Sequence, residues 1–293
     1  VTLKKYKGKK ICNDASLAIY QSILAMAAID SLTDQNGKTT VHINTIFNKV
    51  IQQKMAGINQ MWIFDNPEAN EMKKIALAKR AKRRSEADET ESGKKIAYKL
   101  NAEHVEDIQT LLRYMGILYI TSPPGVEAEQ YGAFLTRGNK NDRFCDYMIT
   151  SDSDVLFFGG NMLRMSTRKS ETGKTKKTIY QEYELAEILT ETGLSYNKFL
   201  KMGAIMGTDF NEKMPRIGPM TVMKKLDDLD LNESMEKTVE YFRSDVSTGV
   251  ASSVYEKYNR EKLVEYLVSK KFNTDRVNKR LDEFEGKSIN GGG

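Results

Sequence analysis

Four acidic side chains stand in two closely spaced pairs, and each pair lies beside an apolar run. Glu127 and Glu129 follow one run, and Asp152 and Asp154 follow another. Residues two apart in an extended chain point to the same side, so the members of a pair can converge on one point. Carboxylates that converge repel one another and raise one another's pKa unless a cation lies among them. Since magnesium and similar ions prefer oxygen ligands, the two pairs favour a metal site, with a solvated acidic face as the alternative.

The elements that must position these acids are short apolar runs that alternate with segments of helical period. One run precedes Asp14, and three more span 61–64, 117–120 and 147–150. Apolar residues recur at helical spacing over 17–27, 41–55, 102–115 and 127–135. Strands that alternate with helices predict a mostly parallel sheet whose carboxyl ends share one edge. That edge would carry Asp14, Asp65, Glu127, Glu129, Asp152 and Asp154.

The rest of the chain predicts a basic helix, a hairpin and a helical C-terminal region. We expect a basic helix over 70–84, a mobile polar segment over 85–95, a hairpin of strands 163–168 and 178–183, two helices within 183–206, a helix from 217 through 226, an acidic segment over 226–236 and an amphipathic helix over 261–284. Gly116 is expected to end the helix before it as a C-cap.

The composition is that of an ordinary globular protein. The 293 residues are 40% hydrophobic and 29% charged with a net charge of +5, which suits one large α/β domain or two smaller ones. No apolar run approaches the ~18 residues of a transmembrane helix, and no signal peptide opens the sequence. Cys12 and Cys145 lie in apolar or aromatic company, so we expect reduced structural thiols. Because the first residue is Val1, we expect the natural N-terminus to lie upstream.

Six sequence blocks occur in an order and spacing that resemble the flap endonuclease family of structure-specific 5′ nucleases, also called the Rad2/XPG family. The blocks are 13–20, 63–65, 78–84, 127–130, 151–154 and 207–209, and the resemblance covers about residue 9 to about residue 281. It implies a PIN-like 5′-nuclease fold, in which a twisted central sheet is flanked by helices, with a helical gateway or cap and a helix-two-turn-helix element that binds DNA.

The resemblance also implies one catalytic cluster of seven carboxylates that binds two divalent ions, normally magnesium, with manganese as a substitute. The cluster consists of Asp14, Asp65, Glu127, Glu129, Asp152, Asp154 and Asp209. The chemistry agrees, because two-metal hydrolysis of a phosphodiester needs an activated water and charge neutralisation rather than a side-chain nucleophile. The only histidines, His42 and His104, lie near no acidic block and are expected to be structural or surface residues.

Basic and aromatic residues of the blocks match DNA-binding positions of the family. Lys73 and Arg80 match catalytic basic residues of the gateway helix, and they lie seven residues apart on one helical face. Arg83 and Arg84 lie close to the same stripe, which can hold the scissile phosphate, with a solvated basic helix as the alternative. Tyr20 matches an aromatic residue that stacks on a base, with a place in the core as the alternative.

The segment 207–226 resembles the helix-two-turn-helix element of the family, beside which relatives bind potassium. Arg216 stands where the family usually has glycine, and arginine does not replace a glycine that needs a positive φ. Gly218 and Pro219 remain, with Pro219 at an expected first helical turn. We therefore expect duplex binding through Arg216 and Gly218 and leave the potassium site open.

These features predict a single 5′-nuclease domain over 1–293, divided into an N-terminal nuclease region 1–84, a gateway or cap 85–115, an internal nuclease region 116–200, the helix-two-turn-helix 201–226 and a C-terminal helical region 227–293. The cap is shorter than expected for cellular relatives. The expected function is cleavage of 5′ flaps or branched DNA in replication, repair or recombination. A double-strand 5′ exonuclease, a junction resolvase and a non-catalytic scaffold for branched DNA are the alternatives.

The expected partner is branched or flapped DNA, bound by a monomer. Residues 280–284 resemble the motif by which relatives bind the sliding clamp only faintly, so we expect no clamp binding through this chain. No membrane partner is expected. The protein would be nuclear if cellular, cytoplasmic if it comes from a cytoplasmic DNA virus, and in neither case secreted.

Overall fold

A seven-stranded sheet organises the described part of the chain. The computed structural model describes residues 2–26, 32–68, 71–73, 77–78, 81–82, 85–86, 100–169, 176–246 and 251–286. The strand order is β6-β5-β4-β1-β2-β3-β7. The strands are β1 (Lys10–Asp14), β2 (Asn59–Phe64), β3 (Tyr119–Thr121), β4 (Tyr147–Ile149), β5 (Met162–Lys169), β6 (Lys176–Tyr183) and β7 (Ser252–Val254). The five central strands are parallel, and β6 and β7 run antiparallel at the two edges. The prediction of a mostly parallel sheet is confirmed.

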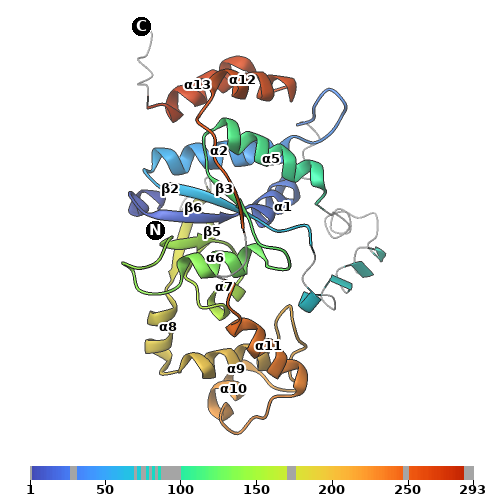
Figure 1. Cartoon of the computed structure of the whole chain (residues 1–293), viewed down its shortest axis with the longest axis vertical. Helices are drawn as coiled ribbons and strands as arrows, with labels where there is room; N and C mark the ends of the chain where they lie inside the picture. The colour runs from blue at the N-terminus through green and yellow to red at the C-terminus, as the bar shows by residue number, and fades with distance from the viewer. Residues whose placement is uncertain are drawn as a thin grey trace.

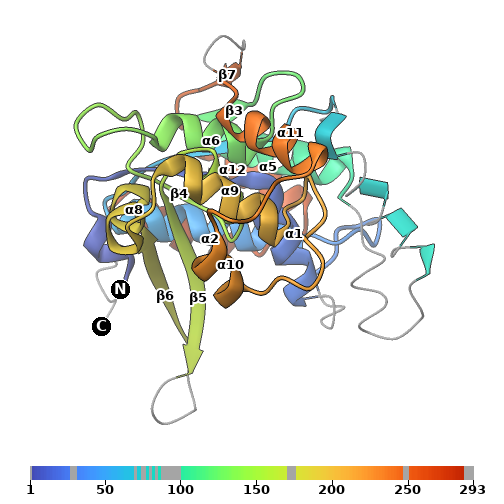
Figure 2. The ribbon, with the colours of Figure 1, turned by 90° about the horizontal axis from the view of Figure 1, so that it is seen from below.

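Helices cover both faces of the sheet (Figure 1). One face carries α1 (Ala15–Met26), α2 (Val41–Met55) and α5 (Ala102–Tyr114), and α12 (Arg260–Ser269) and α13 (Thr274–Phe284) form an outer layer over α2 and α5. The other carries α6 (Ala128–Thr136), α7 (Asp154–Phe157), α9 (Tyr196–Met206) and α11 (Glu233–Arg243). Two short helices, α8 (Leu185–Thr192) and α10 (Pro219–Lys225), and two 3-10 turns, η1 (Leu3–Tyr6) and η2 (Glu71–Lys73), complete the described elements. The β5–β6 hairpin projects away from these layers (Figure 2).

Burial on both faces explains why the central strands are mostly apolar, and the buried Asn13 amide of β1 is paired with that of Gln53. All residues of β1 after Lys10 are buried, and so are the last four residues of β2. A parallel strand that is covered by helices on both sides has no solvent face to which a polar residue could turn. The polar residues that the chain needs for chemistry therefore come where the strands stop.

The structure corrects three of the predicted elements. The third strand begins at Tyr119 rather than at residue 117. The helix predicted over 261–284 is two helices, because Lys271 adopts a φ of 63° and the chain turns before α13 begins. The acidic segment 226–236 contains the start of α11, whose first turn is capped by the side chain of Asn232. The edge strand β7 was not predicted.

Three further predictions agree with the described residues. Gly116 follows α5 with a φ of 66°, as a C-cap glycine does. Cys12 and Cys145 are free and buried, and burial raises the pKa of the Cys12 thiol. Within the described ranges no helix is both long enough and apolar enough to cross a bilayer.

A buried carboxylate links three helices on one side of the sheet. Asp107 on α5 accepts a hydrogen bond from the Tyr266 hydroxyl at 2.9 Å and lies 3.0 Å from His42 Nε2 and 2.7 Å from Lys270 Nζ. Burial by itself raises the pKa of Asp107, but the bonds from His42, Lys270 and Tyr266 outweigh it and lower the pKa to about 2. His42 is fully buried, which fits a structural role, and His104 caps the first turn of α5.

We predict that Asp107→Asn lowers the free energy of unfolding by roughly 2 kcal/mol at neutral pH, because a depressed pKa means that the ionised form is stabilised in the native state. The contribution is present above the unfolded pKa and disappears as the pH falls through the native value of about 2. Urea unfolding of both proteins at neutral and acidic pH measures it. Glu103→Gln, which removes an exposed partner of Lys38, should change little. An unfolding difference that does not narrow in acid would contradict the assignment.

Candidate active site

The structure brings the predicted acids to the carboxyl ends of neighbouring strands. Asp14 is the last residue of β1, and Asp65 directly follows β2. The register pairs Asp14 with Ile63, so the two strand ends lie nearly level. The other acids come from the starts of α6 and α7, which follow β3 and β4, and from the loop after α9: Glu127, Glu129, Asp152, Asp154 and Asp209. Five separate segments of the chain thus supply carboxylates to one edge of the sheet.

Backbone N–H groups at helix starts fix three of these carboxylates. The three bonds join Leu17 N to Asp14 Oδ1 at 2.8 Å, Ala128 N to Asp65 Oδ1 at 2.8 Å, and Asp154 N to Asp152 Oδ1 at 3.0 Å. Each bond satisfies an N–H that has no partner within its own helix, and the positive end of the helix dipole favours the charge it meets. The acids are therefore held in place by the fold itself.

Burial and mutual repulsion raise the pKa of several acids. For Asp14 burial is the larger cause, the charges of Asp65 and Asp152 add to it, and the pKa is about 7. For Asp154 burial comes first and the charge of Asp152 second, and the pKa is again about 7. Burial and the nearby charges of Asp14 and Asp65 raise the pKa of Glu129 well above its usual value. Side chains that shift one another in this way form a single electrostatic cluster.

Lys73 is a cation within this cluster. Its Nζ lies 2.5 Å from Glu127 Oε2 and 3.6 Å from Asp209 Oδ2, and only 8% of the residue is exposed. Burial by itself lowers the Lys73 pKa, but the charges of Glu129 and Glu127 outweigh it and raise the pKa above its ordinary value. Lys73 therefore stays charged and neutralises part of the repulsion around it.

The donor set suits hard divalent cations. All seven donors are carboxylates, and raised pKa values at such a site fall when a cation binds. Within the described ranges, however, no group of three or more histidine, cysteine, aspartate or glutamate side chains is already arranged to hold a metal ion. The acids are gathered and electrostatically coupled, with an ammonium rather than a coordination shell among them.

Comparison with known proteins gives these residues a context. A model of the XPG N-terminal domain matches residues 1–87, and a model of the XPG I-region matches residues 116–209. The chain belongs to the XPG/Rad2 family of structure-specific nucleases. The flap endonuclease 1 proteins of Homo sapiens and Ovis aries are each 32% identical to it in an alignment of 251 residues that covers 81% of this chain. The chain spans 63% of the length of these relatives.

Solved structures show that the fold is shared. The flap endonuclease-1 from Methanococcus jannaschii superposes with a TM-score of 0.74 at 22% identity, over 99% of this chain and 96% of that one. The catalytic core of Rad2, solved in complex with a DNA substrate, gives a TM-score of 0.72 at 18% identity over 97% of this chain and 95% of that one. At these identities the likeness concerns the fold.

The structure describes only some of the other residues that match the XPG/Rad2 family. Arg80, Arg83 and Arg84 lie outside the described residues, as do residues 87–99 of the predicted gateway or cap. Tyr20 lies half-buried on α1. Gly218 is the N-cap of α10 with a φ of −105°, which any residue can adopt.

Lys49 is a residue of the site that the sequence did not reveal. It lies on α2 with its Nζ 5.3 Å from the Trp62 ring centroid. Burial lowers its pKa to about 8, and the charge of Asp14 opposes that shift. With Asp14, Gln21 and Ser151 it lines a hollow of about 20 Å³ at the edge of the acid cluster. The only clue in the sequence was a lysine within the apolar stripe of a helix.

Arg216 takes the backbone conformation that glycine takes more easily. Its φ is 61°, so the left-handed turn before α10 forms although the family's usual glycine is missing. The expectation that arginine does not fit such a position is therefore wrong for the backbone. An L-residue in this region stores about 1–2 kcal/mol, and β-branched residues fit worst.

We predict that Arg216→Val destabilises the protein by about 1–2 kcal/mol, whereas Arg216→Asn and Arg216→Gly are nearly neutral or mildly stabilising. Since the side chain is exposed, the difference reports backbone strain rather than lost packing. Equilibrium unfolding in urea measures it. Equal stabilities of the valine and asparagine variants would show that the turn relaxes away from positive φ.

Proposed function

We propose that this chain is a metal-dependent 5′ nuclease that cuts DNA phosphodiesters where single and double strands meet. The observation that carries the proposal is the cluster of seven carboxylates with Lys73 among them, built at the carboxyl edge of a parallel sheet. Membership of the XPG/Rad2 family supports a nuclease, and the flap endonuclease 1 relatives support 5′ flaps as the substrate.

The carboxylates would hold metal ions, and Lys73 would contact the substrate. Asp14, Asp65, Glu127, Glu129, Asp152, Asp154 and Asp209 would hold two magnesium ions. Bound magnesium supplies an activated water and neutralises charge on the phosphate. Lys73, buried and charged, would meet a nonbridging phosphate oxygen once DNA reaches the cluster. Its contact with Glu127 would then be exchanged for one with the substrate.

Other contacts on the DNA are proposed from the family match. Tyr20 would stack on a base near the cut, and Arg80, Arg83 and Arg84 would bind the phosphates of the single strand. Arg216 and Gly218, in the turn before α10, would meet the duplex backbone. Nothing in the sequence resembles a base-reading helix, so sequence preference should be slight.

We predict that Asp152→Asn lowers the rate of flap cleavage at least ~100-fold, because an amide cannot supply the charge that a divalent ion needs. The variant keeps an oxygen that can accept the bond from Asp154 N, so the fold should survive. A 5′-labelled flap substrate with magnesium, followed over time, gives the rates. Asp142→Asn, in an exposed loop, is the matched control. Cleavage by Asp152→Asn at the wild-type rate, or none by the wild type with either magnesium or manganese, would reject the proposal.

We further predict that Lys73→Met destabilises the metal-free protein by about 2 kcal/mol, because it leaves buried carboxylates without their cation. Magnesium should then raise the melting temperature of the variant more than that of the wild type, since a bound ion replaces the lost charge. Thermal melts with EDTA and with magnesium test this. Lys198→Met, which breaks an exposed pair with Asp227, should respond like the wild type. An equal magnesium effect in all three proteins would show that Lys73 and the metal do not share a site.

Substrate choice distinguishes the remaining possibilities within the family. The chain of human GEN1 that was solved with Holliday junction DNA has the same fold, with a TM-score of 0.67 at 14% identity. Rates on flap, nicked, blunt and four-way junction DNA compare the flap nuclease with an exonuclease or a resolvase. A scaffold would bind branched DNA equally well with and without divalent ions and would cut none of these substrates.

A further inference from the structure

A groove lies at the edge of the sheet opposite to the acids. It is a hollow of about 320 Å³ at the amino ends of β1, β2, β3 and β4, four of the five parallel strands. Lys10 begins β1, Asn59 begins β2, residues 116–118 precede β3, and residues 144–145 precede β4. A strand of five or six residues spans roughly 17–20 Å, so the groove is separated from the acid cluster by the length of the strands. What binds here leaves the cluster open.

Two aromatic side chains stand exposed at this groove over a buried apolar floor. Phe144 is 55% exposed and Tyr255 is 64% exposed, whereas Met61, Cys145 and Ile117 beneath them are at most 8% exposed. An exposed aromatic next to a hollow gains contact area when a partner covers it, and residues of this kind dominate the binding energy of interfaces. The pair therefore points to a docked segment with an apolar side chain.

The charge around the groove is positive. Lys10 Nζ lies 5.5 Å from the Phe144 ring centroid, and Lys54 Nζ lies 5.9 Å from that of Phe284. In the part of the chain that the structure describes, neither ammonium has a carboxylate within 4.0 Å. The acids nearby already have basic partners: Asp146 pairs with Lys9 at 2.8 Å, Glu256 with Arg113 at 3.9 Å and Glu285 with Arg260 at 2.9 Å. Two lysines are thus left to meet an acidic partner.

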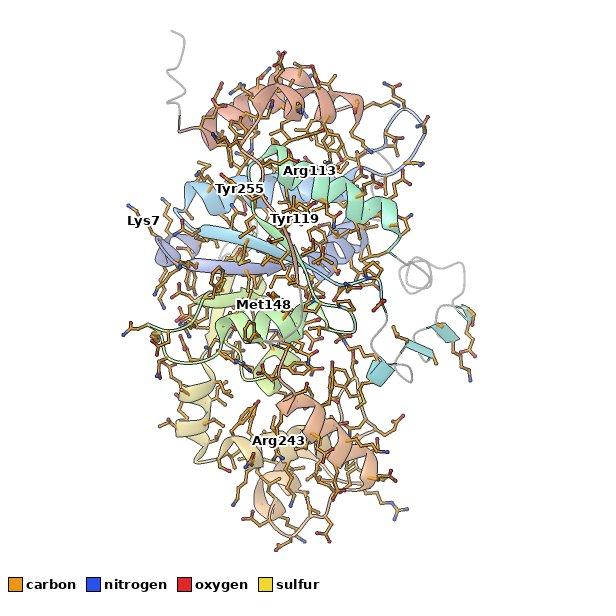
Figure 3. All side chains as sticks on the ribbon, in the orientation of Figure 1. Lys7, Arg113, Tyr119, Met148, Arg243 and Tyr255 are labelled. Carbon is orange, nitrogen blue, oxygen red and sulfur yellow. The ribbon has the colours of Figure 1, made fainter. Side chains whose placement is uncertain are left out.

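One wall of the groove is fixed by close backbone packing. Tyr255 directly follows β7, which pairs with β3, and Figure 3 shows Tyr255 and Tyr119 on these neighbouring segments. The chain beyond Tyr255 is held against the end of α5, because Asn259 N donates to Tyr114 O at 2.9 Å. A Cβ on Gly116 would come within 2.8 Å of Tyr258 N, so glycine permits this approach. Because this wall is already ordered, binding a partner does not carry the entropic cost of ordering it.

We propose that this groove binds an acidic segment of a partner protein, with one apolar side chain seated beside Phe144 and Tyr255 and with carboxylates facing Lys10 and Lys54. A peptide is favoured over nucleic acid because the hollow has the size of a few side chains and an apolar floor, which phosphates cannot cover. The proposal is independent of catalysis at the opposite edge.

Selection from a display library of 12-residue peptides against the full chain tests the proposal. Sequences selected by the wild type, and rejected by the double variant Phe144→Ala/Lys54→Glu, should carry several Asp or Glu residues around one Leu, Ile, Phe or Met. Fluorescence polarisation with a labelled selected peptide should then show at least a tenfold loss of affinity for Phe144→Ala and a several-fold loss for Lys54→Glu. Raised salt should weaken binding by the wild type.

Substitutions at two exposed positions of α12 serve as controls. Val268→Ala and Lys262→Glu, both exposed on α12, should bind the peptide like the wild type. Tyr255→Ala gives a second variant at the groove, and flap cleavage by all variants reports folding and the catalytic edge separately. The proposal is overturned if no selected sequence distinguishes the wild type from the double variant, or if the selected sequences are not acidic. It is also overturned if no peptide binds the groove and labelled oligothymidylate, measured in EDTA, binds the wild type but not the Phe144→Ala variant.

Discussion

The repulsion among carboxylates at one edge of the sheet is the constraint to which the rest of this structure responds. Five separate segments deliver acids there, and burial makes their charges costly. Helix starts supply N–H groups to three of the acids, and Lys73 supplies a full positive charge. A parallel sheet suits this task, because its carboxyl ends lie level while its helices begin next to them.

The same topology gives the molecule a second, chemically different edge. The carboxyl ends of the strands carry the acids, and the amino ends carry Lys10, the exposed Phe144 and the hollow between the strand starts. The two edges face apart and are joined by rigid, buried strands. The DNA cleavage and the peptide binding that we propose would therefore take place at separate edges of the sheet.

The sequence predicted the parts of the fold that depend on local pattern. The apolar run of β2, the period of α2 and the glycine after α5 each follow from their own residues, and the structure has all three. The break at Lys271 was missed because a lysine with positive φ leaves no mark in the composition. The strand β7 was missed because three residues, of which only Val254 is apolar, form a strand only when β3 lies beside them.

The candidate site was likewise only partly predictable from the sequence. Spacing and family resemblance identified the acids, but the described residues do not include Arg80, Arg83 and Arg84. Lys49 was missed because a lysine on an amphipathic helix is normally solvated, and only the packing of α2 on the sheet buries it beside Asp14. The groove could not be predicted either, since its lining comes from five stretches that are distant in the sequence.

The helix bonds to the acids have a consequence for the metal-free protein. In Asp14, Asp65 and Asp152, the Oδ1 atom accepts a backbone N–H. A carboxylate oxygen that accepts one hydrogen bond keeps a second lone pair, so these side chains are oriented without being closed to a ligand. The divalent ions that we propose would therefore meet three carboxylates that the starts of three helices have already oriented.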